Sequence, residues 1–102
     1  MAMYNRSDYV QLVEQTYFDN VVQANIDAVL DCFTDDCLIN IRHGDNPLRV
    51  FRKTPGSNET HLREFYTYLC GNFEAWFGDF IHYIDADSGL CACTFTVKLT
   101  PK

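Results

Sequence analysis

The sequence predicts one α+β domain with an antiparallel sheet, spanning residues 1–102. The chain has the length of a typical single domain. Apolar residues form 47% of it and aromatic residues 15%, which is enough for a hydrophobic core. Apolar residues recur at helical spacing or at alternate positions, in the order helix, helix, hairpin, helix, hairpin. That order favours an α+β fold over a parallel α/β fold.

Three segments show the pattern of amphipathic helices. The first opens at Ser7, a good N-cap, with Asp8 in its first turn, and is expected to end near residue 23. A shorter helix is expected over about 25–33, and a third is expected to begin at residue 57 or 58. Their buried faces are expected at Val10, Val13, Tyr17 and Val21, at Ile26, Val29, Leu30 and Phe33, and at Leu62, Phe65, Tyr66, Leu69 and Phe73.

Four segments are typical of strands, over residues 37–43, 48–53, 76–85 and 90–99. The sequences GDNP and ADSG between them are typical of turns, so the strands are expected to pair as two antiparallel hairpins. The last strand shows the clearest alternation, with threonine and lysine on one face. Its other face is apolar and consists of Cys91, Cys93, Phe95, Val97 and Leu99.

The charge balance argues against two classes of partner. Eight Lys and Arg stand against fourteen Asp and Glu, so the formal net charge is −6. Nucleic acid is not an expected partner, because unspecific binding to phosphates rests on clustered basic residues. Anionic membrane surfaces are not expected partners for the same reason. No apolar run reaches the ~18 residues of a membrane span, and MAMYNRSDYV lacks a signal-peptide core, so a cytoplasmic location is expected.

The five cysteines are expected to be reduced and buried. Their number is odd, and they lie within apolar runs, where thiols act as small hydrophobic side chains. A zinc site usually needs two close C-x-x-C pairs, whereas the spacings here are C-x4-C and C-x-C. None of the five glycines forms a phosphate-binding loop. No metal and no cofactor are therefore expected.

Several segments are similar to those of a known superfamily. VLDCFTDDCLINI follows a long first helix, HLREFY heads a later helix, and the strand pair FIHYIDADSGLCACTFTVKL comes after it. In this order they resemble the SnoaL-like proteins of the nuclear-transport-factor-2-like superfamily, whose relatives include ketosteroid isomerases, scytalone dehydratases and polyketide cyclases. The resemblance implies a curved antiparallel sheet that forms, with three helices, a cone-shaped cavity for a small molecule.

Two features depart from this resemblance. Members usually carry two further strands after the one that matches residues 90–99, so either the domain is expected to be trimmed and to lack its last two strands, or the sequence is incomplete at its C-terminal end. A second subunit is expected to cover the exposed sheet, in a homodimer.

The second departure concerns the catalytic residues. Tyr17 stands sixteen residues before Phe33, which is the spacing of the isomerase tyrosine, but the proton-carrying aspartate of the isomerases falls on Ile41. Steroid isomerase chemistry by that route is therefore not expected.

Tyr17, His43 and Asp45 are the candidates for acid–base chemistry. Alternation along residues 37–43 sends Ile39, Ile41 and His43 to one face. Tyr17 would donate a hydrogen bond and His43 would act as general acid or base, oriented by Asp45, in roles comparable to those of scytalone dehydratases. A core tyrosine and a half-solvated histidine at a strand end are the plainer alternatives. The candidates for lining a ligand pocket, with core packing as the alternative, are Ile39, Ile41, Phe65, Trp76 and His82.

These observations predict a small-molecule-binding protein that acts as a cofactor-free lyase or isomerase, of cyclase or dehydratase type, on a small apolar or aromatic ligand. The alternative is a non-catalytic binding or oligomerisation module, since the same fold serves both and Ile41 replaces the expected base. A closed pocket that holds Tyr17 and His43 would favour catalysis. A pocket filled by Phe and Ile side chains would favour the module.

Overall fold

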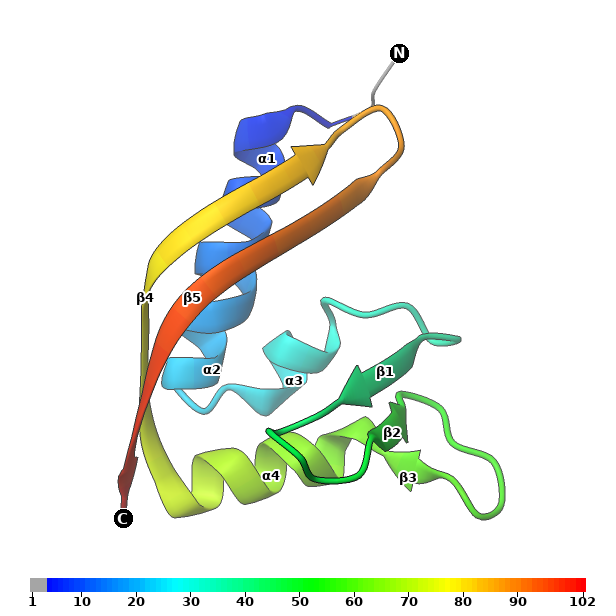
Figure 1. Cartoon of the computed structure of the whole chain (residues 1–102). Coiled ribbons are helices and arrows are strands. Elements are labelled where there is room, and N and C mark those ends of the chain that lie inside the picture. The colour runs from blue at the N-terminus through cyan, green and yellow to red at the C-terminus, as the bar shows by residue number, and fades with distance from the viewer. Residues whose placement is uncertain (1–3) are drawn as a thin grey trace.

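The chain begins with one continuous helical rod made of three pieces. The computed structural model describes residues 4–102, and in it α1 (Arg6–Gln11), η1 (Leu12–Asp19) and α2 (Asn20–Val22) follow one another without a break (Figure 1). The start of MAMYNRSDYV, residues 1–3, lies outside the described part.

The N-cap of this rod is Asn5, not Ser7 as expected. The side chain of Asn5 accepts a hydrogen bond from the backbone N–H of Asp8, and the Asp8 carboxylate accepts one from the backbone N–H of Asn5. Asparagine caps a helix as well as serine does, and the reciprocal bonds with Asp8 decide between the two positions.

The middle piece of the rod, η1, is a π-helix, which the sequence did not indicate. A π-helix takes more residues per turn than the 3.6 of an α-helix, so the side chains are rotated relative to the predicted stripe. Val21 is buried as expected, but Phe18 is buried as well, and Tyr17 is half-buried. This winding brings Phe18 toward the long hairpin described below.

The second helix is shorter than expected, and the third begins later. α3 (Ile26–Leu30) buries Val29 and Leu30, while Phe33 is half-buried beyond its end. α4 (Leu62–Asn72) begins only after a turn in which the Glu59 carboxylate accepts a hydrogen bond from the Gly56 N–H. None of the helices in the described part is long and apolar enough to span a membrane.

The strands form two sheets instead of one antiparallel sheet. β1 (Leu38–Ile41) pairs antiparallel with β2 (Arg49–Arg52), as expected of a hairpin. β2 also pairs in parallel with β3 (Thr60–His61), a short strand that the sequence did not indicate. The second sheet of the described residues consists of β4 (Phe73–Asp85) and β5 (Leu90–Pro101). The α+β class is therefore confirmed, but the expectation of one antiparallel sheet is wrong.

β4 and β5 form a long, curved hairpin beside the helical rod (Figure 1). An irregularity between Gly78 and Ile81 shifts the register, and Asp79 adopts a positive φ of 54° within it. Such bulges bend a strand. The face of the hairpin that contacts the rod is called the inner face below, and the opposite one the outer face.

Two groups of side chains fill the interior. The main core lies among α2, α3, α4 and β2, and its buried members are Val21, Val29, Leu30, Phe51, Leu62 and Tyr66. On the inner face of the hairpin, the Phe18 ring lies 4.6, 5.3 and 4.8 Å from the rings of Phe77, Phe80 and Phe95.

The rod covers the inner face over β4 and only part of it over β5, where Phe18 contacts Phe95. Along β5, Phe95, Val97 and Leu99 remain 41%, 45% and 44% exposed. The apolar residues of β5 share the inner face, as the pairing with β4 shows, but that face is only partly covered within the described residues.

Candidate functional site

Tyr17 on η1 meets a second tyrosine, Tyr66 on α4, inside the main core. Their hydroxyl oxygens lie 2.5 Å apart, and their rings contact edge to face. Burial raises the pKa of Tyr17. Burial, followed by the charge of Tyr17, raises the pKa of Tyr66. Both hydroxyls therefore keep their protons at neutral pH.

This tyrosine pair has one more donor than it uses. Each hydroxyl carries one O–H, and a bond between two hydroxyls consumes only one of them. Neither oxygen has another hydrogen-bond partner within residues 4–102. The second O–H is therefore available to a water molecule or a ligand atom that reaches the pair.

A second polar pair joins the rod to the hairpin. Nε2 of His82 lies 2.6 Å from Oε2 of Glu14, and the two side chains are 7% and 36% exposed. Strand alternation turns His82 to the inner face, where its ring stacks on that of Phe80 at 5.8 Å. Glu14 comes from η1, four residues before Phe18.

The Glu14 contact fixes which nitrogen of His82 carries a proton. An ionised carboxylate only accepts hydrogen bonds, so Nε2 must be the donor. In the neutral ring Nδ1 then carries a lone pair. No buried polar side-chain atom of the described residues lacks a partner, and Nδ1 has no protein partner among them, so Nδ1 reaches solvent. The pair can therefore accept a proton at Nδ1 while Glu14 stabilises the resulting cation.

Cys93 lies opposite His82 in the hairpin. Burial raises the pKa of its thiol, and the charges of Cys91 and Glu14 raise it further. A thiol with a raised pKa is a poor nucleophile at neutral pH, because the thiolate is the reactive form. The Cys93 thiol is therefore not expected to act as a nucleophile at neutral pH.

The structure does not bring together the three predicted catalytic residues. His43 follows β1 and is exposed, and Asp45 is exposed in the next turn. Within residues 4–102 neither side chain makes a hydrogen bond or ion pair with Tyr17, whose hydroxyl partner is Tyr66. The β1–β2 turn carries both residues away from the core face, since β1 ends at Ile41 and not at residue 43.

The predicted lining residues divide into core and surface. Ile39, Ile41 and Phe65 are half-buried and pack against the main core. Trp76 lies on the outer face and is 47% exposed, and the ammonium of Lys98 lies 4.9 Å from its ring centre. The expectation that Trp76 lines an interior pocket is therefore wrong. His82 is the one predicted lining residue that lies on the inner face beside a charged partner.

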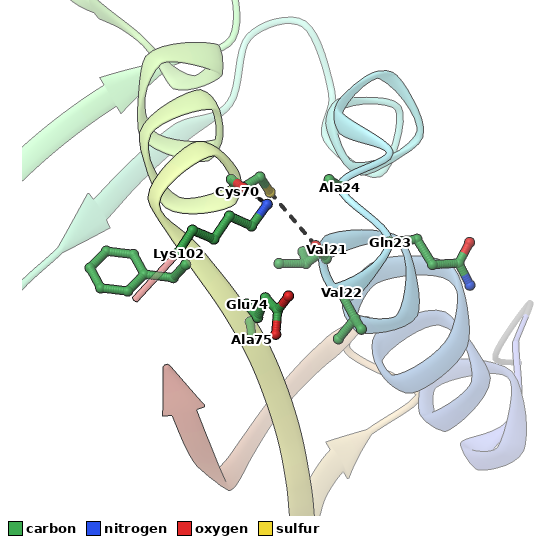
Figure 2. A pocket seen from close by; sticks show the side chains of 9 residues that line it. Val21, Val22, Gln23, Ala24, Cys70, Glu74, Ala75 and Lys102 are labelled. Carbon is green, nitrogen blue, oxygen red and sulfur yellow. Dashed lines mark hydrogen bonds between the residues drawn. The ribbon is translucent and has the colours of Figure 1, made fainter. Parts of the chain in front are cut away.

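Open grooves lie along the surface of the described residues. One groove of about 420 Å³ lies between α2, the end of α4 and the start of β4, and Figure 2 shows Lys102 reaching across it toward Cys70. There the Lys102 ammonium donates to the carbonyl oxygen of Cys70 at 2.8 Å. A second groove of about 470 Å³ runs along the rod past Glu14. No cluster of three potential metal ligands occurs in residues 4–102.

Sequence reasoning missed Glu14 and Tyr66 as functional candidates. Glu14 carried a signal, because it stands four residues after Val10 and three before Tyr17, beside an apolar stripe where an acid is unusual. Tyr66 carried none, since a tyrosine on the apolar face of a helix is usually a core residue.

The chain was compared with protein-family models, with curated proteins and with solved structures, and none of the three comparisons finds a match.

Proposed function

We propose that this chain binds a small apolar or aromatic molecule at the inner face of the hairpin and moves a proton on it. The observation that carries the proposal is the 2.6 Å contact between Glu14 and His82. A carboxylate that holds the far nitrogen of an imidazole, with the near nitrogen accessible, is the arrangement of an oriented general base. Aromatic side chains around the pair suit a flat, apolar ligand.

The proton transfer would run through His82. Nδ1 would accept a proton from an acidic C–H or O–H group of the ligand, and the Glu14 carboxylate would stabilise the imidazolium. In an isomerase the proton would return to another atom of the ligand. In a dehydratase it would leave with a hydroxyl group as water. No cofactor is needed for either step, because both only relocate a proton.

This proposal keeps the SnoaL-like resemblance and changes the residues that carry it. A histidine and an acid remain the working pair, but His82 and Glu14 take the place of His43 and Asp45, while the Tyr17 hydroxyl is bonded to Tyr66 in the main core. The cone-shaped fold of that superfamily is part of the proposal. The five free thiols suit a reducing compartment, so a cytoplasmic location belongs to it as well.

A base-catalysed probe reaction tests the proposal without knowledge of the natural ligand. The ring opening of 5-nitrobenzisoxazole needs only the removal of one carbon-bound proton next to an aromatic ring. We expect the wild type to accelerate it above free imidazole at equal concentration. H82Q should abolish the excess rate, and E14Q should lower it at least tenfold while leaving the fold intact.

The matched control is E59Q. Glu59 also pairs with a basic side chain, Arg52 at 3.1 Å, and is similarly exposed, but it lies in the turn before β3, beside the other sheet. E59Q should leave the rate unchanged. Equal rates for wild type, H82Q and E14Q would contradict the proposal.

A non-catalytic assembly module is the second candidate function. Two observations favour it: Phe18, Phe77 and Phe80 fill the interior where a closed pocket was expected, and the apolar face of β5 is open. A wild type that associates but never accelerates the probe reaction would favour this candidate.

A further inference from the structure

β5 carries both an unpaired edge and an uncovered apolar face. Its one strand partner within residues 4–102 is β4. The free edge therefore presents a row of backbone N–H and C=O groups that are not used in the hairpin. On the inner face Phe95, Val97 and Leu99 stay about half exposed. Natural proteins seldom leave such an edge open, because it is a template for pairing with another strand.

We propose that a second copy of this chain pairs with it along β5, antiparallel, with Phe95 opposite the Phe95 of the other copy. The alternation of the strand supports this register. Odd-numbered residues of β5 lie on the inner face and even-numbered residues on the outer face. A register that pairs odd positions with odd positions therefore keeps the apolar residues of both copies on the inner face, whereas a slip by one residue would place inner residues opposite outer ones. With Phe95 at the centre, Val97 faces Cys93, and Thr94 faces Thr96.

The charges of the strand fit this pairing. Lys98 is the one charged residue of β5, and it points to the outer face over Trp76. In the proposed register it lies opposite Ala92, and the two copies of Lys98 are separated by six positions. That distance is about 20 Å, which exceeds the ~8 Å over which charges interact at physiological salt. Threonine pairs on the same face are favourable neighbours.

The edge of β5 is long enough for a full row of paired positions. β5 has 12 residues, so its edge is about 40 Å long. Stable interfaces bury ~800 Å² per partner, so the exposed side chains of the inner face must contribute to the interface beside the edge itself. Pro101 stays outside the paired segment, so every paired position retains its backbone N–H.

The pairing would also complete the binding surface, a point that rests on the proposed function. A two-fold axis perpendicular to the sheet keeps both inner faces on the same side. The exposed parts of the two β5 strands would then form one apolar floor between two helical rods, with a Glu14–His82 pair toward each side. The second copy thus supplies the wall that a single chain lacks.

Two double variants test the register, and both sites are exposed on the outer face of β5. T94K/T96K places introduced lysines directly opposite one another across the interface, whereas T94E/T96K places an acid opposite a lysine at both positions. Each variant leaves the inner face of the single chain untouched. Light scattering coupled to gel filtration gives the mass over a range of concentrations, and circular dichroism confirms that each variant is folded.

We expect the wild type and T94E/T96K to have twice the chain mass of 11.8 kDa, and T94K/T96K to be monomeric. A monomeric wild type, or a T94K/T96K variant that stays dimeric, would overturn the proposal. In a register shifted so that position 94 faces itself, the two introduced acids of T94E/T96K would lie opposite each other, and this variant would be weakened instead of retained. Failure here leaves the probe reaction of Glu14 and His82 untouched, so the two proposals can fail separately.

Discussion

At the scale of single residues, Tyr17 and Tyr66 bury two hydroxyl groups against each other in a largely apolar core. A buried hydroxyl that loses its partner costs about 1–3 kcal/mol, whereas replacing both partners by apolar groups can be nearly neutral. The hydroxyl of each tyrosine therefore contributes to the free energy of unfolding mainly by giving the other hydroxyl a hydrogen-bond partner.

We expect Y17F and Y66F each to lower the free energy of unfolding by about 1–3 kcal/mol, since each leaves one hydroxyl without a partner. The double variant Y17F/Y66F should lose clearly less than the sum of the two. Urea denaturation of the four proteins gives the coupling. Losses that simply add would show that the two hydroxyls do not depend on each other.

The tyrosine pair also predicts how stability responds to alkaline pH. The pKa values of both residues are raised above the ordinary 10.0 in the folded state, by burial first. A raised folded pKa gives stability that is fully present below pH 10 and is lost as the pH rises above it. Thermal unfolding between pH 8 and 11 should show this loss for the wild type. Y17F/Y66F should show a smaller loss, and an identical loss in both proteins would contradict the assignment.

At the scale of elements, Gly78 and Trp76 pack against each other on the outer face at the bend of β4. Gly78 is buried although it lies on the outer face, because the Trp76 indole covers it and a Cβ there would overlap the ring. A glycine covered by an aromatic side chain is a known way to protect a weak point in a strand.

G78A should displace the indole and lower the free energy of unfolding by about 1–3 kcal/mol, because overfilling a packed site strains it. Trp76 is the single tryptophan of the chain, so its fluorescence should shift to the red as the ring enters water. In a W76A background the same change should cost much less. A G78A variant with unchanged fluorescence would contradict this account of the bend.

The elements also show what the sequence can and cannot predict. Helix and strand positions follow from periodicity, and the apolar alternation of β5 is present along its length. The winding of η1 was not predictable, because a π-helix arises from tertiary packing and has no periodic signature of its own. β3 was missed because two residues carry no pattern, and it pairs only where β2 offers an edge.

For the site, strand alternation predicted that His82 could face inward, but it could not name the partner. The contact with Glu14 spans 68 positions, and no local pattern encodes a pairing of that range. His43 was placed wrongly because β1 ends at Ile41, and the alternation used for that residue stops there. Strand ends are set by turn geometry and by neighbouring strands, which single-residue patterns describe poorly.

At the scale of the whole molecule, the helical rod joins two packed units. On one side it contributes Val21 and Tyr17 to the main core, and on the other it holds the hairpin through Phe18 and Glu14. The proposed site lies where rod and hairpin meet, and the open strand β5 forms the outer border of the same surface. The proposed proton transfer and the proposed pairing of two copies would therefore both depend on the packing of the hairpin against the rod.

The most direct test of this account is the protonation of the His82 ring, measured by long-range ¹H–¹⁵N NMR of the folded protein with E14Q as reference. The account predicts that the neutral ring carries its proton on Nε2 and a lone pair on Nδ1, with a weaker preference for that tautomer in E14Q. A ring with its proton on Nδ1, in the wild type as in E14Q, would contradict the central claim that Glu14 orients His82 as a base.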